Sequence, residues 1–176
     1  TGSYNNAIGA NAMRCNTTGH HNNAFGGSAL QNNTTGQYNF AGGYQSLVSN
    51  VSGNNNTSIG IYSMYDNIHG CDNTAIGQET LRNNTTGNYN TGIGQWAMFC
   101  NTTGHNNTGI GVNTLCGNTT GGCNTALGDN ALKGSLSGCD NFAAGNCALR
   151  TNWGGCWNTA IGCGALYSNT TGCHNN

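Results

Sequence analysis

Proline is absent from this chain of 176 residues, and charged residues make up only 5% of it, where about 25% is usual for a globular domain. The formal net charge is −1, so the chain offers no basic surface and nucleic acid is not expected as a partner. No apolar run is long enough to span a bilayer, so no membrane span is expected. Low hydrophobicity is typical of disorder when the net charge is high, which is not the case here. The chain must therefore be ordered by something other than a conventional core.

Acidic residues are scarce as well, and they occupy unrelated places along the chain: Asp66, Asp72, Glu79, Asp129 and Asp140. They form no recurrent pair for acid–base catalysis, and no Ser, His and acid recur together as a catalytic triad would. Glycine pairs such as Gly26-Gly27 belong to a repeat, which excludes a phosphate-binding loop. We therefore expect a protein that is not an enzyme and that uses no cofactor.

Glycine, asparagine and threonine are abundant, and they recur every 17 residues without insertion or deletion. One glycine column is Gly2, Gly19, Gly36, Gly53, Gly70, Gly87, Gly104, Gly121, Gly138, Gly155 and Gly172. An equally strict asparagine column is Asn5, Asn22, Asn39, Asn56, Asn73, Asn90, Asn107, Asn124, Asn141, Asn158 and Asn175. A second glycine column runs from Gly9 to Gly162. The consensus is T-G-x-x-N-T-A-I-G-x-x-A-L-x-x-N-T.

The length of the repeat predicts the architecture. Common α-solenoid repeats need about 33 residues or more, whereas 17 residues suit short strands and turns. The sequence predicts an all-β parallel β-solenoid (β-roll) of ten coils with two short strands per coil, N-T-A-I-G and x-A-L-x-x. The glycines indicate turns with positive φ or close backbone approach, and stacked asparagines predict amide ladders. Residues 1–176 form one repeat domain, and the start in mid-repeat predicts a fragment of a longer fibre.

Each predicted strand pairs a column of small residues with a column of large ones. In the first strand, Ala75 and Ala160 represent the small column, and Ile76 and Ile161 the large one. Adjacent residues of a strand point to opposite faces, so both faces of the roll are restricted to apolar or small residues. This pattern predicts that one face contacts other subunits, most simply in a homotrimer. The alternative is a monomer in which one residue of each pair lies at a corner.

The segments 73–77, 90–94 and 158–162 read N-T-A-I-G, N-T-G-I-G and N-T-A-I-G, and they resemble the N-x-A-I-G repeats of trimeric autotransporter adhesin heads. The whole chain is also similar to the N-T-A-I-G-x-x-A-L-x-x-N-T-T-G arrays of phage and giant-virus tail-fibre-like proteins. The resemblance implies a left-handed parallel β-roll, trimerised along its length, that binds extracellular matrix or host surfaces. The chain departs from the adhesin heads in its longer coil and in its ten cysteines. The ligand and the handedness stay open.

Ten cysteines predict an oxidising compartment. Spacings of 16 or 17 residues place cysteines on successive coils, within disulfide range. The predicted disulfides are Cys100–Cys116, Cys123–Cys139, Cys147–Cys163 and Cys156–Cys173. Cys15 and Cys71 have no partner by this rule. A soft-metal cluster of Cys139, Cys156, Cys173 and His174, or of His20 and His21, is the alternative, although the spacing matches no zinc motif.

The sequence predicts an extracellular, cell-surface or virion-surface fibre segment for attachment. Candidate recognition residues, which vary from coil to coil, are Tyr62, Tyr65, Trp96, Phe99, Trp153 and Trp157; carbohydrate or a host surface is the expected partner, and packing at a rim the alternative role. Two other functions stay open: an end-to-end filament without a ligand, and ice binding by the ladder of Thr17, Thr34, Thr85, Thr102, Thr119 and Thr170. Asn-Thr-Thr sequons predict glycosylation, or turn chemistry alone, at Asn16, Asn33, Asn84, Asn101, Asn118 and Asn169.

Overall fold

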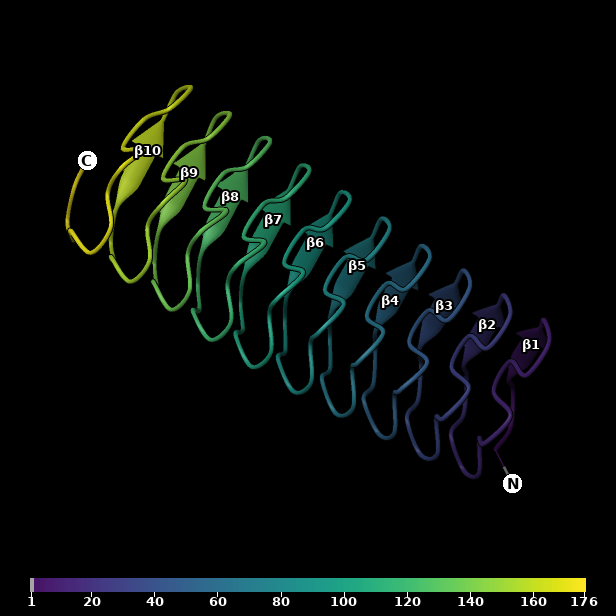
Figure 1. Cartoon of the computed structure of the whole chain (residues 1–176). Helices are drawn as coiled ribbons and strands as arrows, with labels where there is room; N and C mark the ends of the chain where they lie inside the picture. Colours follow the sequence, from purple (N-terminus) through teal and green to yellow (C-terminus); the bar gives the residue numbers. More distant parts are fainter. Residues whose placement is uncertain (1) are drawn as a thin grey trace.

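The computed structural model describes residues 2–176 as one stack of parallel coils, with the two ends of the chain at opposite ends of a rod (Figure 1). Each coil contributes one strand of three residues, and the ten strands form one parallel sheet in sequence order. The strands are β1 (Asn6–Ile8), β2 (Asn23–Phe25), β3 (Phe40–Gly42), β4 (Thr57–Ile59), β5 (Thr74–Ile76), β6 (Thr91–Ile93), β7 (Thr108–Ile110), β8 (Thr125–Leu127), β9 (Phe142–Ala144) and β10 (Thr159–Ile161). Thr74 pairs with Thr91, which pairs with Thr108, so the register follows the sequence repeat. The predicted all-β parallel β-solenoid is confirmed.

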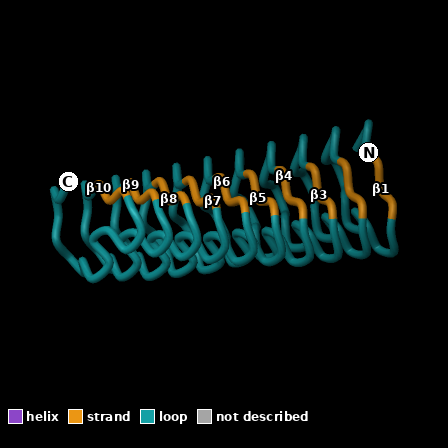
Figure 2. The backbone as a smooth tube through the Cα atoms, turned by 90° about the horizontal axis from the view of Figure 1, so that it is seen from above, coloured by secondary structure: helices purple, strands orange, loops and turns teal. Residues whose placement is uncertain are grey.

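The prediction of two strands per coil is wrong in one respect, because the x-A-L-x-x segment forms turns (Figure 2). Its leucine column has left-handed backbone, as at Leu81 with φ 51°, and Glu79 two residues earlier has φ 55°. The segment still joins neighbouring coils, since the Leu81 N–H donates to the Ala97 carbonyl at 2.9 Å. A left-handed residue costs roughly 1–2 kcal/mol, and burying a leucine side chain contributes roughly 1.5–3 kcal/mol. Burial therefore outweighs the strain at this position.

The curled segment sends both of its apolar columns into the core. The leucine column supplies the largest fully buried side chains, which are Leu30, Leu47, Met64, Leu81, Met98, Leu115, Leu132 and Leu149. The preceding column of small residues is also buried, as Ala97 shows, and it lies close to the small column of the strands, since a Cβ on Gly92 would lie 3.8 Å from the Ala97 Cβ. Where one of these two columns carries a larger side chain, the other carries a smaller one. Thr80 lies next to Gly92, for example, and a Cβ on Gly92 would lie only 2.7 Å from Thr80 Cγ2. The width of the core is therefore fixed from coil to coil.

A ladder of buried asparagine side chains, the Asn5 ladder, runs the length of the rod through the strict asparagine column. Asn90 is typical: its Oδ1 accepts hydrogen bonds from the backbone N–H and the Nδ2 of Asn107, both at 3.1 Å. Its Nδ2 donates to Asn73 Oδ1 at 3.1 Å and to the Gly104 carbonyl at 2.8 Å. Every donor and acceptor of this buried amide is therefore used, which explains how the solenoid buries so many polar groups.

A second ladder, the Asn16 ladder, follows the Asn-Thr-Thr-Gly turns. Asn101 Nδ2 donates to Asn84 Oδ1 at 2.9 Å and to the carbonyl of Gly104 at 3.1 Å. The two glycine columns make these approaches feasible. A Cβ on Gly104 would lie 2.5 Å from the Gly121 carbonyl oxygen, and Gly94, with φ +129°, would place one 2.5 Å from the Gly111 carbonyl oxygen. Both roles predicted for glycine, close approach and positive φ, are present.

Candidate functional site

The outward side of the sheet, the β-face, consists of the first and third residues of each strand. Its third-residue column is Ile8, Phe25, Gly42, Ile59, Ile76, Ile93, Ile110, Leu127, Ala144 and Ile161. Ile76 and Ile93 are each 37% exposed, whereas the alanine column between the two outward columns is buried. Of the two large columns found in the sequence, only this one faces outward. The monomer therefore exposes a continuous apolar stripe beside a column of threonines.

Two coils deviate from this pattern in a compensated way. Phe40 replaces the threonine in the coil where Gly42 replaces the isoleucine, and a Cβ on Gly42 would lie 3.3 Å from the Phe40 ring. Phe142 likewise stands beside Ala144. An aromatic ring thus lies where the apolar column lacks a large side chain. The β-face keeps an even apolar surface along its length, although its sequence varies.

A second apolar region surrounds Arg82 on another side of the rod. Its guanidinium lies over the rings of Tyr65, Phe99 and Tyr62, at 5.3, 5.6 and 6.0 Å from their centroids. Arg82 Nε is 3.8 Å from Glu79 Oε2, and this nitrogen is buried without a hydrogen-bond partner among the described residues. The cation is therefore held mainly by ring faces. The structure thus brings together three of the six predicted recognition residues.

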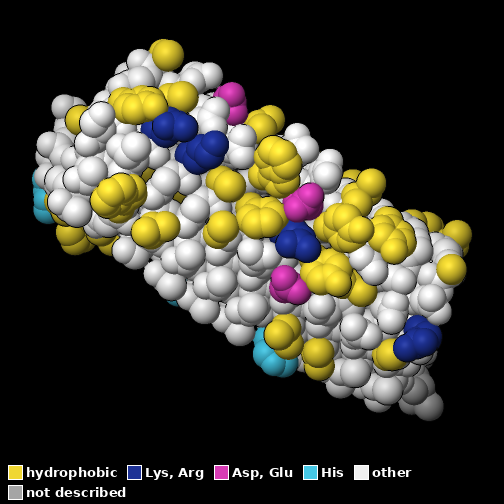
Figure 3. All heavy atoms as spheres, viewed as in Figure 1, with side chains coloured by type: hydrophobic (Ala, Val, Ile, Leu, Met, Phe, Trp, Pro, Cys, Tyr) yellow, Lys and Arg dark blue, Asp and Glu magenta, His cyan; other side chains and the backbone are white. Residues whose placement is uncertain are grey.

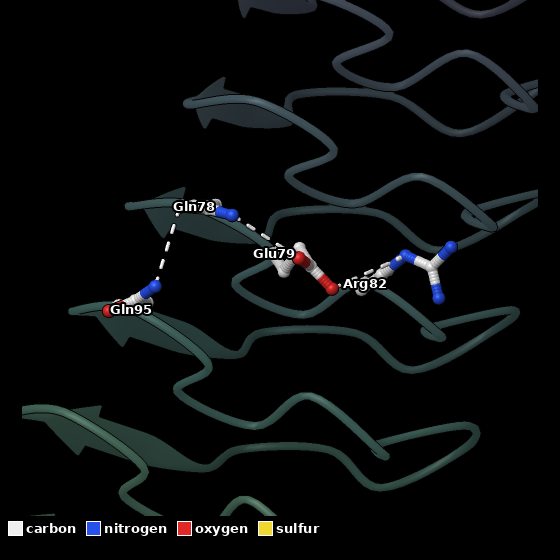
Figure 4. Close-up of polar contacts among 4 residues, drawn as sticks. All are labelled: Gln78, Glu79, Arg82 and Gln95. Carbon is white, nitrogen blue, oxygen red and sulfur yellow. Dashed lines mark hydrogen bonds and ion pairs between the residues drawn. The ribbon is translucent and has the colours of Figure 1, made fainter.

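The carboxylate of Glu79 is the polar end of this region. Figure 4 shows its side chain between Arg82 and Gln78, with Gln95 on the following coil. Gln78 Nε2 donates to Glu79 Oε1 at 3.3 Å, and Gln95 Nε2 donates to Gln78 Oε1 at 3.4 Å. These contacts are exposed and contribute little stability. They hold the carboxylate at the rim of the adjacent hollow.

That hollow has a volume of about 480 Å³ and is lined by Glu79, Trp96, Phe99, Asn113, Cys116 and Lys133. A smaller one of about 310 Å³ shares Cys116 and Lys133 with it and extends to Arg150. We call the two together the aromatic groove. Its residues lie on three sequence columns, each with a step of 17: Glu79–Trp96–Asn113, Phe99–Cys116–Lys133–Arg150 and Gly117–Gly134–Thr151. Figure 3 shows hydrophobic side chains gathered along this view of the rod with the few charges between them.

The thiol of Cys116 lies in the floor of the aromatic groove. Burial raises its pKa, the nearby Cys100 thiol adds to the increase, and Lys133 opposes it. Burial raises the pKa of Cys100 as well. Both thiols are therefore protonated at neutral pH, so the groove has an uncharged, weakly polar floor between Glu79 and Lys133.

The other two predicted recognition residues lie elsewhere. Trp153 and Trp157 are 56% and 54% exposed and line neither part of the groove. Trp157 contacts the His174 ring on the next coil, with a centroid distance of 5.0 Å. Sequence reasoning missed Glu79, Asn113 and Lys133 as neighbours of Trp96 and Phe99. Their columns are visible in the spacing, but a column alone does not reveal a hollow.

All ten cysteines are unpaired in the structure. Cys100 and Cys116 are neighbours across coils, since the Cys100 N–H donates to the Cys116 carbonyl at 2.9 Å. The closest sulfur contact lies outside the four predicted pairs: Cys139 Sγ and Cys156 Sγ are 2.7 Å apart. The four predicted disulfides stay predictions. Among residues 2–176, no three His, Cys, Asp or Glu side chains are arranged to hold a metal ion.

The threonine ladder and the sequons both take part in the fold. Thr34 Oγ1 donates to the Val51 carbonyl at 3.0 Å, and Thr102 Oγ1 donates to the Thr119 carbonyl at 3.0 Å. The six sequon asparagines belong to the Asn16 ladder, where the Nδ2 of Asn101 donates two hydrogen bonds. A glycan on that nitrogen would replace one of its hydrogens and break a ladder bond. The structure therefore supports turn and ladder chemistry for these positions.

Comparison with protein-family models, with curated proteins and with solved structures finds no match to this chain. The family resemblance stays an expectation. Over residues 2–176, the structure contains no helix that is long and apolar enough to cross a membrane.

Proposed function

We propose that this chain is a scaffold segment of an extracellular or surface fibre, without enzymatic activity, that associates side by side with copies of itself through the β-face. The observation that carries the proposal is the outward apolar column of the β-face, in which Ile76, Ile93 and Ile110 are between 37% and 41% exposed. Rigid, repetitive backbone on the same rod supports a structural role. The near absence of charge removes the repulsion that usually keeps parallel copies apart.

The size of the β-face decides how strong this association is. Ten strands at about 4.8 Å per strand give a strip about 48 Å long but only about 10 Å wide. That is roughly 500 Å² per partner, below the usual ~800 Å² of a stable interface. We therefore expect association that depends on concentration and becomes tighter with each added coil. A closed ring, most simply a trimer, covers such a strip on every copy.

Lysine in place of Ile76 and Ile93 should abolish this association. Two positive charges per copy would have to be buried next to one another in the interface, so the double variant should sediment as a monomer at concentrations where the unchanged chain is oligomeric. Sedimentation velocity under reducing conditions measures this. The matched control is Thr86→Lys with Thr103→Lys, which adds the same charge at two exposed positions of successive coils outside the β-face. If the Ile76→Lys, Ile93→Lys variant keeps the oligomer and its circular dichroism is unchanged, the β-face is not the interface.

A second proposed function, surface attachment, is favoured by the aromatic groove. The rings of Trp96 and Phe99 stand beside a carboxylate, an amide and an amine, from Glu79, Asn113 and Lys133. Apolar walls with a few polar groups are typical of small-ligand sites. A sugar ring fits this chemistry, since its C–H face can lie on an aromatic ring while its hydroxyls bond to the polar side chains. We propose oligosaccharide as the ligand class.

Alanine in place of Trp96 should lower oligosaccharide binding at least tenfold, because it removes the largest wall of the groove. The measurement is binding of the purified chain to a panel of immobilised neutral and acidic oligosaccharides. Trp153→Ala, which removes a more exposed tryptophan that lies outside the groove, should bind as the unchanged chain does. Equal loss in both variants, or no binding by the unchanged chain, would contradict the carbohydrate proposal and leave the scaffold proposal standing.

A further inference from the structure

Three cysteines occupy the same position of three successive coils. Cys139, Cys156 and Cys173 each follow a glycine of the first glycine column. In several other coils, the side chain at this position accepts a hydrogen bond from the backbone of the coil before it. The Gln37 N–H donates to Asn54 Oδ1 at 2.8 Å, for example. The sulfurs take over this role, so the thiols are held in line along the rod.

The three sulfurs are not equivalent. Cys156 Sγ accepts the Cys139 backbone N–H at 3.1 Å and the Cys139 thiol at 2.7 Å. Cys173 Sγ accepts the Cys156 N–H at 3.2 Å, but the Cys156 thiol is directed to the Gly154 carbonyl at 3.7 Å, and the Cys173 thiol to the Thr171 carbonyl at 3.5 Å. Two donors thus point at the Cys156 sulfur, and one of them is the neighbouring thiol. The geometry therefore favours the pair Cys139 and Cys156 over the pair Cys156 and Cys173.

We propose that Cys139 and Cys156 form a reversible disulfide that joins two neighbouring coils and leaves Cys173 as a free thiol. Directly stacked coils, about 4.8 Å apart, lie within the Cα separation of about 4.4–6.8 Å that a disulfide needs. Cys139 and Cys156 are both partly exposed, so a small oxidant can reach them. The inference does not depend on the scaffold or attachment functions proposed above.

The reaction is thiol–disulfide exchange with a small-molecule disulfide such as oxidised glutathione. Cys156, as the thiolate, attacks one sulfur of that disulfide, which breaks its S–S bond and releases one small thiolate. Cys139 then attacks Cys156 Sγ, and its proton passes through water to the departing small thiolate, which leaves as the second small thiol. Two protein thiols are oxidised and one small disulfide is reduced to two thiols.

The raised pKa of Cys139 is consistent with a first attack by Cys156. Donation of the Cys139 thiol hydrogen to Cys156 raises the pKa of Cys139 to about 12, and burial adds to the increase. Cys139 therefore keeps its proton at neutral pH, and that proton is directed to Cys156 Sγ. Because the thiolate is the nucleophile, the raised pKa of Cys139 makes Cys139 a poor first nucleophile.

Stepwise oxidation tests the assignment. The reduced, folded chain is treated with increasing oxidised glutathione, quenched with a thiol-blocking reagent and digested with trypsin, which separates Cys139 from Cys156 by cleavage after Arg150. We expect the first link to form between peptides 134–150 and 151–176, before any other link is complete. Fragment ions should place this link at Cys139 and Cys156. A first link at Cys156–Cys173 or Cys123–Cys139 would overturn the proposal.

Two serine variants sharpen the result, because residues 134–150 and 151–176 also contain Cys147 and Cys163. Cys173→Ser should keep the first link at the same yield and glutathione concentration. Cys139→Ser should abolish it and leave Cys156 as the mixed disulfide with glutathione. If Cys139→Ser still gives the same linked peptides, the link uses Cys147 instead of Cys139 and the proposal fails. Both variants remove one sulfur from the same column, so either one controls for the fold of the other.

Discussion

Alanine in place of Asn90 should strongly destabilise the solenoid, because the Asn90 side chain joins its own coil to both neighbouring coils. The variant leaves the backbone N–H of Asn107 and one hydrogen of Asn107 Nδ2 buried without an acceptor. It also removes one donor from Asn73 Oδ1 and one from the Gly104 carbonyl. Each buried polar group left unpaired costs about 1–3 kcal/mol. The free energy of unfolding should therefore fall by about 3–5 kcal/mol.

The effect should also be local. In a solenoid each coil contacts only its neighbours, so a break at Asn90 should separate the unfolding of the coils on its two sides. Urea unfolding followed by circular dichroism should show a lower midpoint and a broader transition. Asn83→Ala is the control, because that side chain is half-exposed and lies in neither ladder; its effect should stay within about 0.5 kcal/mol. Equal midpoints for the two variants would show that the Asn5 ladder does not stabilise the fold.

Asparagine in place of Ser135 should stabilise the chain, because it fills the one gap in the Asn16 ladder between Asn16 and Asn169. At this gap Asn118 Oδ1 and Ser135 Oγ are buried without a hydrogen-bond partner among the described residues. The new side chain could donate to Asn118 Oδ1 and to the Gly138 carbonyl, and accept from Asn152 Nδ2, as its counterparts do in other coils. A gain of about 1–3 kcal/mol is expected.

The gain should appear as a higher urea midpoint and as slower amide hydrogen exchange in the coils around residue 135. Ser137→Asn makes the same exchange two residues away at an exposed position, and it should change neither quantity. Asn118→Ser should have the opposite effect, since it widens the gap by one coil. An unchanged or lower midpoint for Ser135→Asn would mean that the coil at this point cannot accommodate the amide, and that its serine is required by local backbone geometry.

Much of the fold could be predicted from the sequence because one period controls it. A strict step of 17 residues fixes which residues are stacked, so the ladders of Asn90 and Asn101 and the two glycine roles follow from spacing. The conformation of Leu81 could not be predicted, because alternation of faces holds only for extended backbone. Leu81 is left-handed, so Thr80 and Leu81 both face the core, and the second predicted strand does not form.

The candidate sites were less predictable for a related reason. Spacing shows that Glu79, Trp96 and Asn113 share a column, but not whether a column points inward or outward, or whether two outward columns enclose a groove. One sequence signal for the β-face was the coil in which Phe40 stands in place of threonine and Gly42 in place of isoleucine. A large residue that compensates for a small one nearby implies that the two positions share a surface. For Cys139, Cys156 and Cys173, spacing indicates the column, whereas the orientation of each thiol selects the pair.

Static light scattering of the unchanged chain under reducing conditions, over a range of concentrations, tests the central functional claim most directly. Reduction removes any contribution from disulfides, so the mass reports association through surfaces alone. The scaffold proposal predicts a mass that rises with concentration from one chain towards a closed oligomer, most simply a trimer. A mass that stays at one chain at every concentration would contradict association through the β-face.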